Sequence, residues 1–361
     1  MVADDCASLD TASGPHVGHQ GSNGRDMVVL GQSRDPQIGA VLERLSHRGV
    51  HAHVLDYYAP APFALDFSAP GCPRIRIGDA VLGSDIVVWD RSKFFSNTSY
   101  YFDDAAPGET VDDTRRRHQL QEVEWRGAYQ LLATLPHVAF LNHPVQRNAM
   151  LKPVQQMIAQ ELGLKTPPSL VTNDKKAIEA FLGIHPRAVL KSLSGGRFAR
   201  LDEPGARTDM LMTMQVATQD VEAADASAFI RAPHFFQENI PKAFEVRLFA
   251  YRGGAHPFSV DSQKARFTST DWRHGASVLE WRPCLAPSHV LDAVQMFLNR
   301  FELFYGSFDF IVTPEGEWVF LECNRDGQWA WLDRLVDHAL SNGLADAIFD
   351  TWFNENSKGV D

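Results

Sequence analysis

Apolar and polar positions along residues 27–56 predict a strand, a helix and a second strand. Residues 27–32, "MVVLGQ", form a short apolar run that ends in a glycine-containing turn. Residues 36–49 carry apolar side chains at helical spacing, and Gly49 stands where a helix C-cap would. Residues 50–56, "VHAHVLD", then alternate like a strand. Because strands that flank a single helix are normally parallel, we expect one β-α-β unit here.

The two segments that follow extend this pattern. Residues 85–90, "DIVVWD", predict a further buried strand. Residues 113–135 are laced with Arg and Glu and predict a long amphipathic helix. The apolar residues of that helix are Leu120, Val123, Ala128, Leu131 and Leu132.

A second block begins near residue 138. The strand-like "VAFLN" (138–142) leads into a helix with Ile158 and Leu162 on its inner side. Gly163 closes this helix, and the strand-like "SLVTN" (169–173) follows. Helices and strands therefore continue to alternate, which predicts an α/β fold.

The last part of the chain is richer in strands. Residues 187–198 predict a strand that runs into a Gly-rich loop, and several strand-like segments follow from residue 234. A helix over 288–301 precedes a hairpin over 305–324. This concentration of strands gives the predicted α/β fold an α+β character.

Composition restricts the class of protein and its partners. A chain of 361 residues is long for one core, so two or three subdomains are expected. Its 44% hydrophobic and 22% charged residues are ordinary for a globular protein. The net charge of -11 argues against a surface that coats nucleic acid, so an anionic ligand would need a local cationic pocket. No apolar stretch approaches the roughly 18 residues needed to span a membrane.

The cysteines and the N-terminal residues indicate a cellular compartment. The cysteines have no spacing typical of zinc sites or disulfide frameworks, which favours a reducing cytoplasm. Residues 1–26 are rich in Gly, Ser and Asp and lack the basic start and apolar middle of a signal peptide. We expect them to be a disordered leader or an over-long start, with Met27 opening the folded part.

The hairpin over 305–324 gathers oxygen-bearing side chains on one face. If Glu315-Gly316 is a two-residue turn, Asp309 lies directly opposite Glu322. Strand alternation then places Asn324 on the same face as Glu322. Two opposed carboxylates repel, and a hard cation such as Mg2+ between them would relieve the repulsion. The alternative is a solvated acidic edge of a hairpin.

Two lysines are candidates for binding phosphate. Lys191 ends an apolar strand just before the Gly-rich loop 192–196, an arrangement suited to a phosphate clamp with a lid. Lys152 precedes Pro153 at the start of a helix, which is a weaker signal. The alternative is an ordinary solvated lysine, which is the commoner case for a lysine placed like Lys152.

Arg247 lies in the strand-like segment "FEVRLF". Alternation places Glu245 and Arg247 on one face of this strand, opposite its apolar residues. The pair could serve a ligand or form a structural salt bridge on a sheet face.

Taken together and in this order, these segments resemble the ATP-grasp ligases. The resemblance covers about residues 27–355 and rests on Lys152 after "LNHP", Lys191 before a Gly loop, "FQENIPKAFEVR", and the set Asp309, Glu322 and Asn324. The motifs "KPVQQ", "TPPSLVTND", "DWR" and "E-x-N-x-x-G-Q-W" narrow it to the graspetide (microviridin-type) peptide maturases.

The resemblance implies an ATP-grasp fold with an N-terminal α/β pre-ATP-grasp domain. It would place that domain at 27–140, the central ATP-grasp subdomain at 141–233 and the C-terminal subdomain with the metal site at 234–355. Residues 1–26 would precede the fold.

The resemblance also implies roles for individual residues. Lys152 and Lys191 would contact ATP phosphates. Gln237, Glu238 and Ile240 would form the hinge over the adenine. Glu245 would approach the ribose. Arg247 and Arg273 would face the transferred phosphoryl group or the developing oxyanion. The Mg2+ ligands would be Asp309, Glu322 and Asn324.

The implied activity is ligation of a ribosomally made precursor peptide, leader plus core. An Asp or Glu side chain would become an acyl phosphate, and a Ser, Thr or Lys side chain would then close a macrocyclic ester or amide. The alternatives are a ligase that joins free amino acids or extends a peptide terminus, and a nucleotide-binding regulator without turnover. The prediction includes no nucleic-acid or membrane partner and leaves a homodimer open.

Two segments depart from the family pattern. The front-domain strand, usually ending aromatic-Arg-Arg, reads Trp89-Asp90-Arg91-Ser92, and Asn324 is followed by Arg325-Asp326 where Asn-Pro is usual. Neither change removes a residue that the nucleotide chemistry needs, but neither identifies the peptide substrate.

Overall fold

The structure is a computed structural model. It describes residues 25–56, 59, 61–68, 73–83, 85–92, 108–193, 197–199, 208–210, 213–264 and 279–354. Side chains are described throughout these ranges except at 111, 115, 147, 148, 197–199 and 208–210. Most of the segment predicted to be disordered, residues 1–24, lies outside the described residues, as does Arg273.

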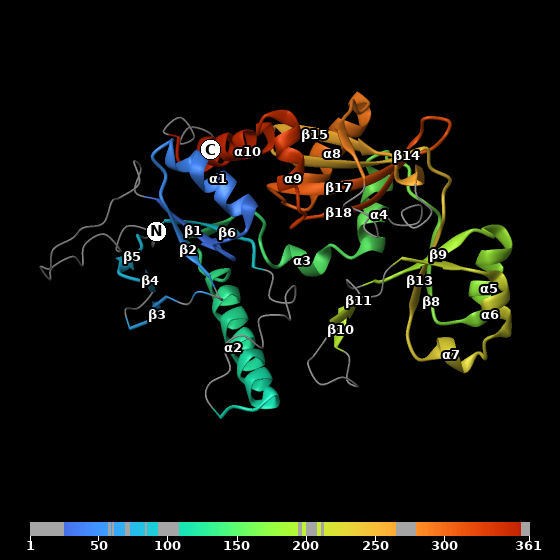
Figure 1. Ribbon diagram of the computed structural model, residues 1–361, viewed down its shortest axis with the longest axis horizontal. Helices are drawn as coiled ribbons and strands as arrows, with labels where there is room; N and C mark the ends of the chain where they lie inside the picture. The colour runs from blue at the N-terminus through green and yellow to red at the C-terminus, as the bar shows by residue number, and fades with distance from the viewer. Residues whose placement is uncertain are drawn as a thin grey trace, which may run out of the picture. The chain divides into compact units, whose positions relative to one another are not determined.

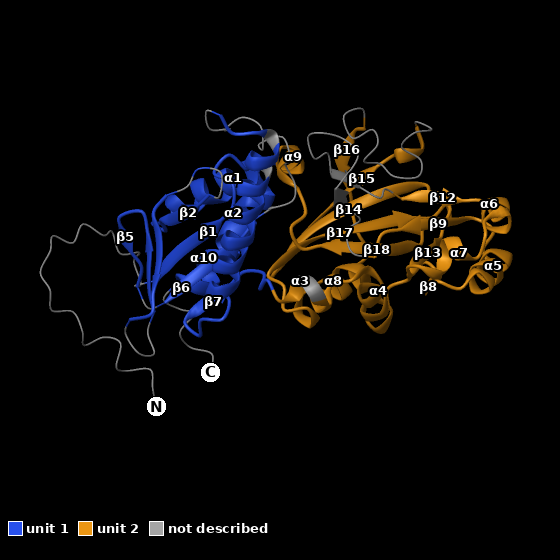
Figure 2. Cartoon of the chain, turned by 90° about the horizontal axis from the view of Figure 1, so that it is seen from below, with its two compact units in different colours: residues 1–144, 337–361 blue, residues 145–336 orange. Residues whose placement is uncertain are grey.

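The chain divides into two compact units (Figure 2). Unit 1 comprises Met1–Pro144 and Asp337–Asp361, and unit 2 comprises Val145–Val336. The C-terminal residues thus group with the front of the chain, and not with the segment 234–355 to which the resemblance assigned most of them. The subdomain limits within unit 2 stay a prediction.

The described residues of unit 1 form a parallel sheet, a small antiparallel sheet and three helices (Figure 1). The elements are β1 (Asp26–Leu30), α1 (Pro36–Ser46), β2 (Ala52–Leu55), β3 (Phe63–Asp66), β4 (Arg74–Ile77), β5 (Ala80–Val81), β6 (Ile86–Asp90), α2 (Val111–Leu132), β7 (Val138–Phe140) and α10 (Ala339–Trp352). The parallel sheet has the order β2-β1-β6-β7, and β3-β4-β5 pair antiparallel. The β-α-β unit predicted over 27–56 is therefore present.

Helix α1 forms where the apolar spacing predicted it. Asp35 caps its N-terminus by accepting a hydrogen bond from the Gln37 N–H at 2.9 Å, and Pro36 occupies the first turn. Gly49 has a φ of 78°, which suits its predicted role after the helix end. Helix α10 packs against α1, with Arg44 donating to the Asn342 side-chain oxygen at 2.6 Å. These contacts tie the C-terminal helix to the front of the chain.

Helix α2 forms as predicted, but only part of the apolar set lies on its buried side. Leu120, Val123 and Leu131 are exposed, whereas Tyr129 and Leu132 are buried. The inner face is largely polar toward the N-terminus of the helix, so apolar residues alone misplace it. A capping box at Thr110 starts the helix two residues earlier than predicted. No helix among the described residues is long and apolar enough to cross a membrane.

Unit 2 holds the remaining elements, several of them short. They are α3 (Gln146–Ala149), α4 (Lys152–Glu161), β8 (Ser169–Thr172), α5 (Lys175–Ile184), β9 (Ala188–Lys191), β10 (Arg197–Ala199), β11 (Thr208–Met210), β12 (Met214–Val216), α6 (Thr218–Ala223), α7 (Ser227–Ile230), β13 (His234–Glu238), β14 (Phe244–Tyr251), β15 (Gly254–Val260), η3 (Ser262–Lys264), β16 (Trp281–Pro283), α8 (Ser288–Arg300), β17 (Tyr305–Val312), β18 (Trp318–Asn324), α9 (Ala330–Asp333) and η5 (Arg334–Val336).

Two antiparallel sheets form the body of unit 2 (Figure 1). The smaller has the order β12-β9-β13-β8, and its core includes Ile178 and Leu182 of α5 and Val221 of α6. The larger has the order β16-β15-β14-β17-β18, and the apolar sides of α4 and α8 share its core. Strands β10 and β11 form a separate pair. The antiparallel pairing confirms the predicted strand-rich C-terminal part.

Candidate functional site

The middle strands of the larger sheet separate a hydrophobic face from a charged face. On β14 and β17, Leu248 and Phe308 belong to the hydrophobic core with α4 and α8. Alternation sends Arg247 and Asp309 to the other face, where the two residues are direct cross-strand partners. The predicted alternation of β14 is therefore confirmed, and it places a cation beside the carboxylate of the next strand.

The hairpin between β17 and β18 reaches the predicted pairing by another route. Thr313 pairs with Glu317, because the Thr313 N–H donates to the Glu317 carbonyl at 3.0 Å. The connection thus has three residues, with Gly316 at a φ of 86°, and the predicted two-residue turn was wrong. A register shift between Asp309 and Phe310 then adds one residue on β18, and Asp309 faces Glu322 as expected.

This β-bulge determines which face Glu322 occupies. Without it, Glu322 would lie two residues from Phe320 on the same face, which is the hydrophobic core. The extra residue, Leu321, reverses the alternation, so that Cys323 enters the core and Glu322 joins Asp309. A local irregularity in β18 therefore builds the carboxylate pair.

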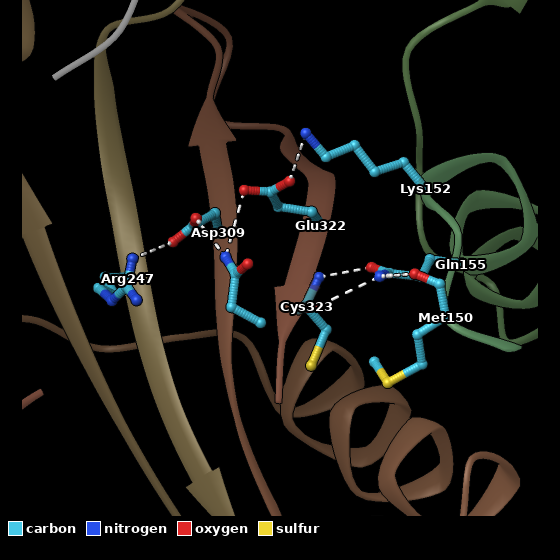
Figure 3. A network of polar contacts seen from close by, with 8 residues as sticks. Met150, Lys152, Gln155, Arg247, Asp309, Glu322 and Cys323 are labelled. Atoms are coloured by element: carbon cyan, nitrogen blue, oxygen red, sulfur yellow. Dashed lines mark hydrogen bonds and ion pairs between the residues drawn. The ribbon is translucent and has the colours of Figure 1, made fainter. Parts of the chain in front are cut away.

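Three side chains offset the charge of the two carboxylates (Figure 3). Arg247 Nη1 lies 3.0 Å from Asp309 Oδ1, and both side chains are less than one-tenth exposed. Lys152 Nζ, at the start of α4, lies 3.1 Å from Glu322 Oε2. The Asn324 amide nitrogen lies 3.3 Å from Asp309 Oδ2 and 3.2 Å from Glu322 Oε1. The pairing that repulsion would disfavour is thus stabilised from three sides.

The donor set fits a hard divalent cation. Two carboxylates and one side-chain amide are oxygen ligands of the kind that Mg2+ takes when phosphate and water complete its shell. The Asn324 amide nitrogen now bridges the carboxylates, and rotation of the amide by half a turn would present its oxygen instead. Among the described residues no group of three or more His, Cys, Asp or Glu is placed to hold a metal, so a site here needs this amide and ligands from a substrate.

Arg247 is held from more than one direction. Its guanidinium carbon lies 5.7 Å from the ring centroid of Trp331, a cation-π contact. Gly327 passes so close that a Cβ there would lie 2.8 Å from Arg247 Nη2 and 2.5 Å from Ser307. A larger residue than glycine at 327 would therefore displace the arginine.

Glu245 lies on the same face of β14 but makes a different contact. Its Oε1 lies 2.6 Å from Lys242 Nζ, and both side chains are 8% exposed. The ion pair leaves the implied ribose contact of Glu245 as a prediction.

The other implied nucleotide residues lie on the smaller sheet. Lys191, half-buried at the end of β9, pairs with Phe235 of β13. Gln237 Nε2 donates to Ser169 Oγ at 3.2 Å, and Glu238 Oε2 lies 3.2 Å from His185 Nδ1. Ile240 follows β13 and is half-buried.

The structure thus joins some of the candidate residues and separates others. Lys152, Arg247, Asp309, Glu322 and Asn324 form one network. The residues on β9 and β13 form a second group on the smaller sheet. The predicted lid glycines at 195 and 196 lie outside the described residues.

Cys323 has no place in the chemistry of this face. Its side chain lies in the hydrophobic core, and a Cβ on Gly306 would lie 2.7 Å from its Sγ. Burial, reinforced by the charges of Asp309 and Glu322, raises the pKa of the Cys323 thiol well above its usual range. A protonated, enclosed thiol is a poor nucleophile.

Three contacts of the site were absent from the sequence prediction. Gln155, Lys242 and Trp331 were given no role, although Gln155 stands within the quoted "KPVQQ" motif three residues after Lys152. That spacing puts both residues on neighbouring parts of one helix face and could have indicated a shared function.

Proteins similar to this chain are found among the solved structures. No protein-family model matches the chain, and no curated protein does. A ligase of Chryseobacterium gregarium, described as a RiPP-associated ATP-grasp ligase in complex with ADP and a leader and core peptide, superposes with a TM-score of 0.74 at 22% identity. The alignment covers 91% of this chain and 97% of that one.

Two further solved structures have the same architecture. The macrocyclase MdnC of Microcystis aeruginosa MRC, bound with precursor peptide MdnA, has a TM-score of 0.69 at 24% identity, over 90% of this chain and 99% of that one. The ATP-grasp ligase PsnB, complexed with a variant of its minimal precursor, Mg and ADP, has a TM-score of 0.66 at 19% identity, over 90% and 98%. The likeness thus extends over both units, and the chain has the ATP-grasp fold, as the sequence motifs predicted.

Proposed function

We propose that this chain is an ADP-forming ligase that cross-links the side chains of a ribosomally made precursor peptide. The single observation that supports the proposal most is the Lys152–Glu322, Asp309–Arg247 and Asn324 network on the charged face of the larger sheet. The peptide-bound ATP-grasp ligases with the same fold supply the substrate class.

The reaction has two steps and needs no nucleophile from the protein. A carboxylate oxygen of an Asp or Glu side chain in the peptide attacks the γ-phosphorus of ATP, and ADP leaves. A hydroxyl or amine of the same peptide attacks the resulting acyl carbon, a proton is released, and inorganic phosphate leaves. The sum is one ester or amide formed and one ATP converted to ADP and phosphate.

The residues of the network would act by charge and position. Asp309, Glu322 and Asn324 would hold Mg2+, which when bound neutralises charge on phosphate oxygens. Lys152 and Lys191 would contact the phosphates. Arg247, already fixed by Asp309 and Trp331, is suited to a developing negative charge without further ordering.

The roles of the residues on or next to the smaller sheet, and that of Glu245 on β14, are proposals of the same kind. Gln237, Glu238 and Ile240 would line the adenine, and Glu245 would approach the ribose. A homodimer and a cytoplasmic location also belong to this proposal. The net charge of -11 supports an exterior that does not bind nucleic acid.

The decisive experiment incubates the full chain with ATP, Mg2+ and a candidate precursor. The probe is the peptide encoded by a short reading frame, rich in Thr, Ser, Asp and Glu, beside the gene. We expect ADP release and a peptide lighter by one water for each bond, with side-chain cross-links located by fragmentation. A peptide heavier by one amino-acid residue would favour terminal extension instead. ADP release with free Asp and Ser, but not with the peptide, would overturn the proposal in favour of a small-molecule ligase.

A further inference from the structure

Gln155 makes a set of hydrogen bonds that joins helix α4 to strand β18. The side chain is 4% exposed. Its Oε1 accepts from the Cys323 N–H at 2.7 Å, and its Nε2 donates to the Cys323 carbonyl at 3.2 Å. The same Nε2 donates to the Met150 carbonyl at 2.8 Å. Figure 3 shows this amide between the helix and the strand.

These contacts complete the edge of the larger sheet. Strand β18 is an edge strand, so the backbone groups on its outer side have no partner strand. The Gln155 amide satisfies the N–H and the carbonyl of Cys323 together, as a neighbouring strand would. Farther along, the Phe320 N–H donates to the Lys165 carbonyl at 2.8 Å. Helix α4 and the residues after it thus take the place of a sixth strand.

The position of Gln155 relates this edge to the charged network. Lys152 lies one helical turn before Gln155, and Glu322 directly precedes Cys323. The three hydrogen bonds of Gln155 (the Gln155 clamp) therefore fix the backbone beside Lys152 and beside Glu322. These two residues form an ion pair in which Nζ and Oε2 lie 3.1 Å apart. The start of α4 has no side-chain cap, and the hydrogen bond to the Met150 carbonyl supplies a local anchor there.

We propose that Gln155 is a positioning residue that sets the phosphate-contacting Lys152 against the metal-binding Glu322. This inference rests on the proposed function and deepens it, because it makes the nucleotide lysine and the metal ligand parts of a single unit. Loss of the clamp separates the two without removing either. Residues that hydrogen-bond metal ligands directly change metal affinity about 10- to 100-fold when replaced, and Gln155 would act on Glu322 through the adjoining backbone.

The test compares Gln155→Met with Gln160→Met on the same helix. Methionine has nearly the length of glutamine and removes all three hydrogen bonds of Gln155. Gln160 is exposed and donates to Thr166 Oγ1 at 2.6 Å, so its replacement makes the same chemical change away from the network. ADP affinity of the full chain is measured by calorimetry with and without Mg2+, beside a thermal unfolding curve.

The proposal predicts a specific loss. In wild type, Mg2+ should strengthen ADP binding, and in Gln155→Met this gain should fall about tenfold or more while Mg2+-free affinity stays within about twofold. Gln160→Met should match wild type. A merely structural role predicts that both affinities fall together with the melting temperature, and that result would overturn the inference.

Two further results would distinguish failure of the inference from failure of the proposed function. If Gln155→Met does not fold, Gln155→Glu is measured in the same way, because it keeps the size of the side chain and removes both hydrogen bonds donated by Nε2. An undiminished Mg2+ gain in the folded variant refutes the role of Gln155 and leaves the proposed function standing. A wild-type chain that binds no ADP at any Mg2+ concentration refutes the proposed function, and the inference fails with it.

Discussion

Two carboxylates of unit 1 and two of unit 2 differ in the contacts that they make. In unit 1, Asp90 is the last residue of β6 and accepts hydrogen bonds from the N–H and the hydroxyl of Ser92, at 2.9 and 2.6 Å. Asp56 accepts from the N–H and the hydroxyl of Ser33 in the same way, at 2.7 and 2.8 Å. These carboxylates close the turns that follow parallel strands.

In unit 2, Asp309 and Glu322 lie within strands and meet the side chains of Arg247, Lys152 and Asn324. A backbone N–H is fixed by the fold, whereas a side chain can move when a ligand offers a better partner. The contacts in unit 1 are suited to stabilising the fold. Those in unit 2 are suited to giving way to a bound ligand. Substitutions should therefore act on unfolding in unit 1 and on ligand binding in unit 2.

The largest expected effect is that of Glu322→Gln. The substitution keeps the size of the side chain and removes the negative charge proposed to hold Mg2+, so ATP turnover should fall to background. Relief of repulsion from Asp309 and loss of the Lys152 ion pair act in opposite directions on stability, so the melting temperature should change little. ADP release and thermal unfolding measure the two quantities. Turnover at the wild-type rate would remove Glu322 from the site.

Lys191→Ala should have the next largest effect. If Lys191 neutralises phosphate charge, its loss should raise the KM for ATP about tenfold, equivalent to about 1.4 kcal/mol. Lys165→Ala is the matched control, because Lys165 is exposed and forms an ion pair with Glu317. Equal KM values for the two variants, from ATP titrations of ADP release, would make Lys191 an ordinary surface lysine.

Asp90→Ala tests the other half of the comparison. Removing a buried carboxylate that accepts two hydrogen bonds should lower the free energy of unfolding by about 1–2 kcal/mol and leave ADP affinity unchanged. Asp66 caps Ser68 with the same Asp-x-Ser spacing, but it is exposed, and Asp66→Ala should have a smaller effect. Urea unfolding of both variants measures the difference. A loss of ADP affinity in Asp90→Ala would break the separation between the units.

The smallest expected effect concerns pH. Burial lowers the pKa of His256 from its usual value of 6.5, against the opposing charge of Asp333. The folded state therefore keeps His256 neutral where the unfolded chain takes up a proton. Its contribution to stability is present above about pH 6.5 and is lost as the pH falls through the lower folded pKa.

His256→Gln should accordingly flatten the fall in unfolding free energy between neutral pH and about pH 5. His289, which is exposed, provides the control His289→Gln. Urea titrations at several pH values measure the slopes. Identical slopes in His256→Gln and wild type would show that another group causes the loss of stability at acid pH.

The order of the elements and the charged face could be read from the sequence because they depend on alternation and spacing. Arg247 and Asp309 followed from period-2 patterns in strands whose other face is apolar. The inner face of α2 could not be read in this way, because its N-terminal part packs with polar side chains such as Thr114 and His118. The spacing of apolar residues does not identify the buried face of a helix where the buried residues are polar.

The opposition of Asp309 and Glu322 was right although the turn behind it was wrong. The count from a two-residue turn was off by one residue, and the bulge at Leu321 compensated. Turn chemistry identified Gly316 as a residue with positive φ, but not the length of the connection. The Gln155 clamp escaped prediction for a different reason: it joins a side chain to the backbone of a residue 168 positions away.

The bulge in β18 has a consequence for insertions and deletions in this hairpin. Deleting one residue among 314–316 would shorten the connection to two residues and leave the pairs from Thr313–Glu317 to Asp309–Glu322 in register. Deleting Leu321 would remove the bulge, and Glu322 would then directly follow Phe320, so alternation alone would keep it opposite Asp309. Chain length at the tip and chain length in β18 can therefore be varied separately. Libraries that vary the tip of this hairpin can change its length as well as residue identity.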